Sequence, residues 1–135
     1  MARIGETADP LIMVVDDDID TLEMMECFLD GEGYRTVLWH QATGAHEIIR
    51  KEQPNLVILD LRMEQRDAGW TILEQMRADP ATAHIPAIMY SGSGCWFRAQ
   101  RETLLVLNCD ALEKPFELAE LQVKIDAALG QPREA

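Results

Sequence analysis

The sequence is poor in positive charge and in aromatic side chains. Its 135 residues include 12 Lys and Arg against 24 Asp and Glu, a net charge of −12, and aromatic residues make up only 6%. A surface this acidic repels nucleic-acid phosphates and anionic lipid, so we expect neither nucleic acid nor a membrane as a partner. No apolar run approaches the ~20 residues of a membrane span. The polar first ten residues do not resemble a signal peptide.

Cysteine is also scarce. Cys27, Cys95 and Cys109 are odd in number and far apart, and no Cys-x-x-Cys spacing occurs. This excludes a disulfide framework and a zinc site of the usual spacing, and it favours a reducing, cytoplasmic compartment.

The sequence does contain short apolar runs that end in carboxylates. Leu56–Leu59 follows Pro54 and leads into Asp60, and Leu11–Val15 leads into Asp16. Runs of this length and composition predict strands buried on both faces, as in a parallel sheet. The carboxylates then lie at the carboxyl ends of the strands, the edge at which open α/β sheets bind ligands.

Strand and helix patterns alternate five times along the chain. This alternation predicts a single α/β domain over residues 11–130, a doubly wound five-stranded parallel sheet with five helices, between short tails at 1–10 and 131–135. In the first helix we expect an inner stripe of Thr21, Met24, Met25 and Phe28, with Leu29 alongside it and Leu22 to one side and partly exposed. The fourth helix is expected over Trp96–Leu107, with Phe97, Leu104 and Leu105 facing inward.

Five polar side chains are expected at that carboxyl edge: Asp16, Asp17, Asp60, Ser91 and Lys114. Three neighbouring carboxylates repel one another, so either some are protonated or a cation lies among them. Oxygen ligands with open positions suit Mg²⁺ or Mn²⁺. Together with a lysine and a hydroxyl, they indicate a site for phosphoryl transfer.

Four segments in this order resemble the receiver domain of two-component response regulators, such as the chemotaxis regulators. The segments are Val14–Asp18, Leu56–Met63, Ile85–Gly92 and Glu113–Phe116. The resemblance implies a flavodoxin-like fold with strand order 2-1-3-4-5. It also implies a switch that is phosphorylated by a sensor histidine kinase or phosphotransfer protein and signals to an unknown downstream protein by contact. Such a domain is not an enzyme beyond its own phosphorylation and dephosphorylation.

The same resemblance implies a role for each site residue. Asp60 would be the phosphoacceptor, Ser91 the switch hydroxyl and Lys114 a contact to the phosphoryl group. Mg²⁺ would be held by Asp16, Asp17, Asp60 and the backbone carbonyl of Arg62. The bond between Lys114 and Pro115 is usually cis in this family.

Two departures from the family pattern leave alternatives open. After the phosphoacceptor, Glu64 replaces a proline and Ala68 adds a residue, which predicts a longer, more mobile loop. The aromatic residue usual on the last strand falls at Ala111, so the chain could instead be an interaction module that is never phosphorylated. A phosphatase with an aspartate nucleophile is a third possibility. Such an enzyme would need an Asp-x-Asp motif after the nucleophile strand, and Asp60-Leu61-Arg62 does not have one.

Overall fold

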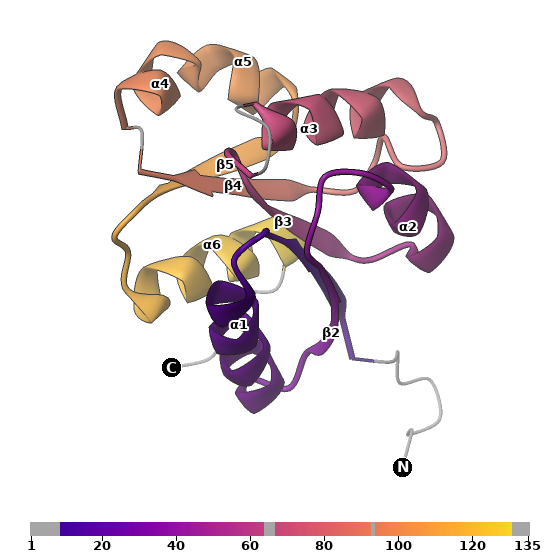
Figure 1. Ribbon diagram of the computed structural model, residues 1–135. Helices are drawn as coiled ribbons and strands as arrows, with labels where there is room; N and C mark the ends of the chain where they lie inside the picture. Colours follow the sequence, from indigo (N-terminus) through magenta and orange to yellow (C-terminus); the bar gives the residue numbers. More distant parts are fainter. Residues whose placement is uncertain (1–8, 64–66, 93, 131–135) are drawn as a thin grey trace.

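The computed structural model describes residues 9–63, 67–92 and 94–130. They form one five-stranded parallel sheet in the order β2-β1-β3-β4-β5, with helices on both faces (Figure 1). The strands are β1 Leu11–Val15, β2 Arg35–Trp39, β3 Leu56–Asp60, β4 Ala87–Ser91 and β5 Cys109–Glu113. The helices are α1 Ile19–Gly31, α2 Ala45–Glu52, α3 Ala68–Ala78, α4 Gly94–Ala99, α5 Arg101–Val106 and α6 Leu118–Leu129. The predicted fold class and strand order are confirmed.

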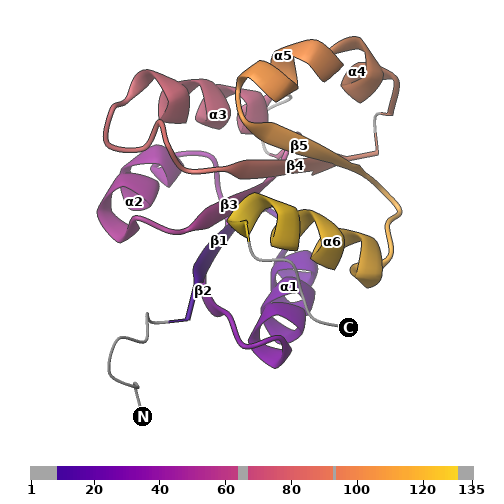
Figure 2. The ribbon, with the colours of Figure 1, turned by 180° about the vertical axis from the view of Figure 1, so that it is seen from behind.

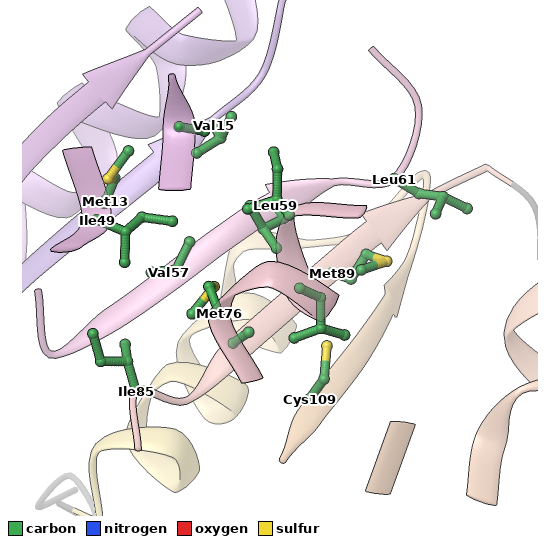
Figure 3. Close-up of a cluster of buried hydrophobic side chains, with 14 of the residues drawn as sticks. Met13, Val15, Ile49, Val57, Leu59, Leu61, Met76, Ile85, Met89 and Cys109 are labelled. Atoms are coloured by element: carbon green, nitrogen blue, oxygen red, sulfur yellow. The ribbon is translucent and has the colours of Figure 1, made fainter. Parts of the chain in front are cut away.

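The sheet separates two apolar cores. Helices α2 to α5 cover one face, and α1 and α6 cover the other (Figure 2). Successive strand residues point to opposite faces, so Met13 and Val15 join the first core while Ile12 and Val14 join the second. Figure 3 shows the first core, where Val57, Leu59 and Met89 of the sheet lie beside Ile49 and Met76 of the helices. Burial on both faces explains why these strands are continuous apolar runs.

The inner face of α1 differs from the predicted stripe. Leu22, Met25 and Leu29 are buried, whereas Met24 is 41% exposed. Apolar residues occur on more than one side of this helix, so periodicity alone permits two stripes one residue apart. Packing against the sheet selects the stripe that contains Leu22, and the expected exposure of Leu22 was wrong.

The predicted helix over Trp96–Leu107 is two short helices. The chain turns at Gln100, whose N–H donates to the carbonyls of both Trp96 and Phe97, and the described residues therefore contain six helices instead of five. Phe97 and Leu104 are buried as predicted, but Leu105 is 72% exposed. Consecutive helical residues point ~100° apart, so Leu105 cannot share the inward direction of Leu104.

The remaining expectations fall partly outside the described residues. The predicted tails lie outside them except for Asp9 and Pro10, and so do residues 64–66 of the predicted mobile loop. Ala68 is buried at the start of α3. Among the described helices, none combines the length and the apolar character that crossing a bilayer requires.

Candidate functional site

Three carboxylates meet at the carboxyl edge of the sheet. Asp16 and Asp17 follow β1 directly, and Asp60 is the last residue of β3, its central neighbour. One carboxylate oxygen of each lies within 4.8 Å of the others. Asp16 and Asp60 are buried and Asp17 is exposed, so the cluster opens to solvent on one side only.

The charge on Asp60 is disfavoured where it stands. Burial is the main cause that raises the pKa of Asp60 to about 6, and the neighbouring Asp16 carboxylate is the second. Lys114 and a backbone hydrogen bond act in the opposite direction and lower this pKa. That bond comes from the N–H of Arg62, which donates to Asp60 Oδ1 at 3.3 Å. A cation bound between the carboxylates would relieve the same repulsion.

Lys114 and Ser91 reach this edge from the last two strands. Lys114 Nζ lies 3.8 Å from Asp60 Oδ2, and the Lys114 N–H donates to the Ser91 carbonyl at 2.8 Å. Ser91 is buried at the end of β4, paired with Glu113 of β5. The peptide bond from Lys114 to Pro115 is cis, as the resemblance implies. The structure therefore brings the sequence-predicted side chains to one edge.

Tyr90 also contacts the site, and it was not among the residues predicted from the sequence. Its hydroxyl donates to Asp16 Oδ2, and Lys114 Nζ lies 4.6 Å from the centre of its ring. Burial, followed by the nearby Asp16 charge, raises the pKa of Tyr90 above its ordinary value, so the hydroxyl remains a donor. Its place directly before the strand-end Ser91 is visible in the sequence, but that place does not distinguish a site residue from a core residue.

Gly69 allows α3 to approach the end of β3. A Cβ atom at this position would overlap the Asp60 carbonyl oxygen and would lie 2.8 Å from Leu61 Cα. The Gly69 N–H donates to the Leu61 carbonyl at 2.9 Å. The absence of a side chain at Gly69 thus permits the close packing of α3 against the backbone that carries Asp60.

The donor set fits a small hard cation. Mg²⁺ prefers oxygen ligands and is usually held in proteins by one or two carboxylates together with waters. Asp16, Asp17 and Asp60 supply carboxylate oxygens at mutual distances that allow one ion to lie among them.

Comparison with known proteins gives consistent matches. A family model described as "Response regulator receiver domain" matches residues 12–126. The transcriptional regulatory protein ZraR of Klebsiella oxytoca is 32% identical over 129 residues, which cover 96% of this chain and 28% of that protein. The DNA-binding response regulator MtrA of Mycobacterium tuberculosis is 32% identical over 130 residues, covering 92% of this chain and 52% of MtrA.

Solved structures show the same likeness. The receiver domain of the sensor histidine kinase PA1611 from Pseudomonas aeruginosa has a TM-score of 0.77 at 26% identity, covers 92% of this chain and is itself covered completely. That structure has a magnesium ion coordinated in its active-site cleft. A putative response regulator from Chloroflexus aurantiacus has a TM-score of 0.78 at 29% identity, with 91% of this chain and 99% of that chain covered.

Proposed function

Because this chain belongs to the family of response regulator receiver domains, the phosphoacceptor switches of two-component signalling, we propose that its switch residue is Asp60. Asp60 would accept a phosphoryl group from a sensor histidine kinase or a phosphotransfer protein, with Mg²⁺ bound. The observation that carries the proposal is the position of Asp60, between two further carboxylates and 3.8 Å from the Lys114 ammonium. We take residues 11–130 as the unit that performs this function, in the cytoplasm.

The proposed metal ligands are the carboxylates of Asp16, Asp17 and Asp60 and the backbone carbonyl of Arg62. A bound Mg²⁺ would supply positive charge that offsets the carboxylates and the oxygens of the phosphoryl group. Asp16 is buried, so its orientation is set by the protein, while the exposed Asp17 faces the solvent from which a cation enters.

The transfer step uses three side chains of this chain. A carboxylate oxygen of Asp60 forms a bond to phosphorus, and the bond from phosphorus to the donor's imidazole nitrogen breaks, leaving its electron pair on that nitrogen. The ammonium of Lys114 pairs with a phosphoryl oxygen, and the Ser91 hydroxyl donates a hydrogen bond to another. Water later hydrolyses the acyl phosphate to the Asp60 carboxylate and inorganic phosphate.

The alternative of an interaction module that is never phosphorylated is not favoured, because the acidic site is present. Ala111, the residue that motivated this alternative, is half-buried on β5. It has no aromatic ring, so the output does not use the aromatic residue that the family usually has at this position. Exposed apolar side chains lie nearby on α5 and α6. Leu105, Val106 and Val123 are 72%, 85% and 67% exposed, which supports a protein contact there as the output.

The chain spans about a quarter to a half of the curated relatives that it matches, 28% of ZraR and 52% of MtrA. Those relatives are named as transcriptional and DNA-binding regulators. For this chain we propose only that the phosphorylated domain signals by protein contact and turns over no substrate other than its own phosphoryl group.

The test is phosphorylation by a small phosphodonor. Wild type, Asp60→Asn and the exposed-site control Asp30→Asn are incubated with Mg²⁺ and phosphoramidate and examined by intact mass. We expect one added phosphoryl group on wild type and on Asp30→Asn, and none on Asp60→Asn. The proposal would be wrong if Asp60→Asn were labelled like wild type, or if wild type stayed unlabelled with both this donor and a phosphorylated kinase.

A further inference from the structure

Tyr90 touches the site from within the protein core. Its side chain has no exposed surface, yet its hydroxyl donates to Asp16 Oδ2 across 74 residues of sequence. The ring packs edge-to-face on Phe116 at 5.9 Å between centroids. Because β4 pairs with β3 so that Tyr90 lies opposite Asp60, the residue stands one strand from the phosphoacceptor, directly before Ser91.

Both oxygens of Asp16 are engaged by the protein. Oδ1 accepts from the Asp18 N–H at 2.9 Å, and Oδ2 accepts from Tyr90. A carboxylate oxygen has two lone pairs, so each oxygen can still face a metal ion or a metal-bound water. With two donors in place, the Asp16 carboxylate cannot rotate freely, and the direction of its remaining lone pairs is fixed.

We infer that Tyr90 is a positioning residue for the metal site, whose hydroxyl orients the Asp16 carboxylate toward Mg²⁺. This inference rests on the proposed function, because it concerns the same Mg²⁺ ion. Donors that orient a ligating carboxylate belong to the shell around a metal site, and their removal typically weakens metal binding by ~10–100-fold. Tyr90 acts through Asp16 and does not itself touch the reacting atoms.

Tyr90→Phe isolates the hydroxyl. Phenylalanine keeps the ring that packs on Phe116 and lies below Lys114, and it removes only the donor to Asp16. The control is Tyr34→Phe at the chain's other tyrosine. Tyr34 is also buried, and its hydroxyl accepts a hydrogen bond from Gln122 Nε2 at 3.0 Å. It precedes β2, at the edge of the sheet opposite the acidic cluster.

Each protein is titrated with MgCl₂ at constant ionic strength while backbone amide signals are followed by ¹H–¹⁵N NMR, which also shows that it is folded. We expect the Mg²⁺ dissociation constant of Tyr90→Phe to rise ~10-fold and that of Tyr34→Phe to match wild type. Equal or tighter Mg²⁺ binding by Tyr90→Phe overturns this inference alone. A wild-type protein that binds no Mg²⁺ overturns the proposed function together with it.

A second measurement follows the Tyr90 side chain in the wild-type protein. Wild type carrying ¹³C at the tyrosine Cζ atoms gives two signals, one for each tyrosine, which Tyr34→Phe assigns. Mg²⁺ is expected to shift the Tyr90 signal along the same binding curve as the amides and to leave Tyr34 unchanged. A Tyr90 signal that stays in place while the amides of the site respond would contradict the inference.

Discussion

Asp60 carries a negative charge at neutral pH, although its surroundings disfavour that charge. Its pKa is raised from 3.8 to about 6, first by burial and then by Asp16. The folded protein therefore binds this proton more tightly than the unfolded chain does. Protonation of Asp60 therefore stabilises the folded state fully below pH ~4, and this stabilisation is lost as the pH rises through ~6.

Asp60→Asn is accordingly expected to stabilise the metal-free protein at pH 7.5, by up to ~3 kcal/mol. The gain should shrink as the pH falls toward 4, where Asp60 itself is protonated. Urea unfolding with a chelator present, at pH 7.5 and pH 5, measures the difference. The exposed substitution Asp30→Asn serves as a control, and a loss of stability in Asp60→Asn at pH 7.5 would contradict the expectation.

Gly69 gives a second prediction at this scale. Gly69→Ala places a methyl group against the Asp60 carbonyl and Leu61 Cα, backbone atoms that cannot rotate away. We expect a loss of ~1–3 kcal/mol in the free energy of unfolding, together with slower labelling of Asp60 by phosphoramidate. Gly31→Ala is the matched control, because a Cβ there meets nothing within 4 Å. Equal stability of the two variants would argue against the close approach.

The site residues could be predicted where chemistry and position coincide. Asp60, Ser91 and Lys114 carry reactive groups directly at strand ends, where the rule for parallel sheets places them together. Tyr90 could not be predicted, since a tyrosine within an apolar strand resembles a core residue and its partner Asp16 lies 74 positions away.

At the scale of elements, Arg77 of α3 joins three segments. Its guanidinium donates to the carbonyls of Leu107 at 2.6 Å and Asn108 at 3.3 Å, beyond α5, and of Ala83 at 3.2 Å, beyond α3. Burial lowers the pKa of Arg77. The guanidinium of arginine has five N–H donors in a planar fork and can donate to several carbonyls at once. The ammonium of lysine places its charge and its donors at a single nitrogen.

Arg77→Lys is therefore not a conservative change. We expect it to lower the free energy of unfolding by ~1–3 kcal/mol, because partly buried carbonyls of Leu107 and Ala83 lose charged donors. Arg101→Lys, at an exposed position of α5, should change it little. Urea unfolding of both variants is the measurement, and an Arg77→Lys protein as stable as Arg101→Lys would show that the fork is dispensable.

The strands could be predicted because each apolar run has a clear boundary, such as Pro54 before β3 and Asp60 at its end. The division between α4 and α5 could not. Residues 95–107 contain neither glycine nor proline, so nothing local marks the turn at Gln100. The choice between two apolar stripes on α1 was likewise made by packing against the sheet and not by the helix sequence.

For the whole molecule, the net charge of −12 means that any salt reduces self-repulsion. Specific binding of Mg²⁺ is therefore recognised as a stabilisation larger than this general effect of salt. We expect MgCl₂ to raise the melting temperature more than NaCl of equal ionic strength, with a gain of ~1.4 kcal/mol at ten times the dissociation constant. Identical curves for the two salts would mean that no Mg²⁺ is bound at the site.

The alternation of strand and helix was enough to predict a single parallel sheet with helices on both faces. The alternation of strands and helices does not determine the spatial order of the strands in the sheet. The predicted order 2-1-3-4-5 came from the family resemblance. Physically, the order depends on which apolar faces meet across the sheet, and the runs in β1, β3 and β4 are too similar in composition to distinguish their neighbours.

The pairing of β4 with β5 has a consequence for the timing of synthesis. Lys114 reaches Asp60 only because β5 adds to the edge of β4, with Ser91 opposite Glu113. On the ribosome, Asp16, Asp17 and Asp60 emerge well before Lys114 does. A partly translated copy therefore holds the three carboxylates of the site without the Lys114 ammonium, and the site is completed only when β5 joins the sheet.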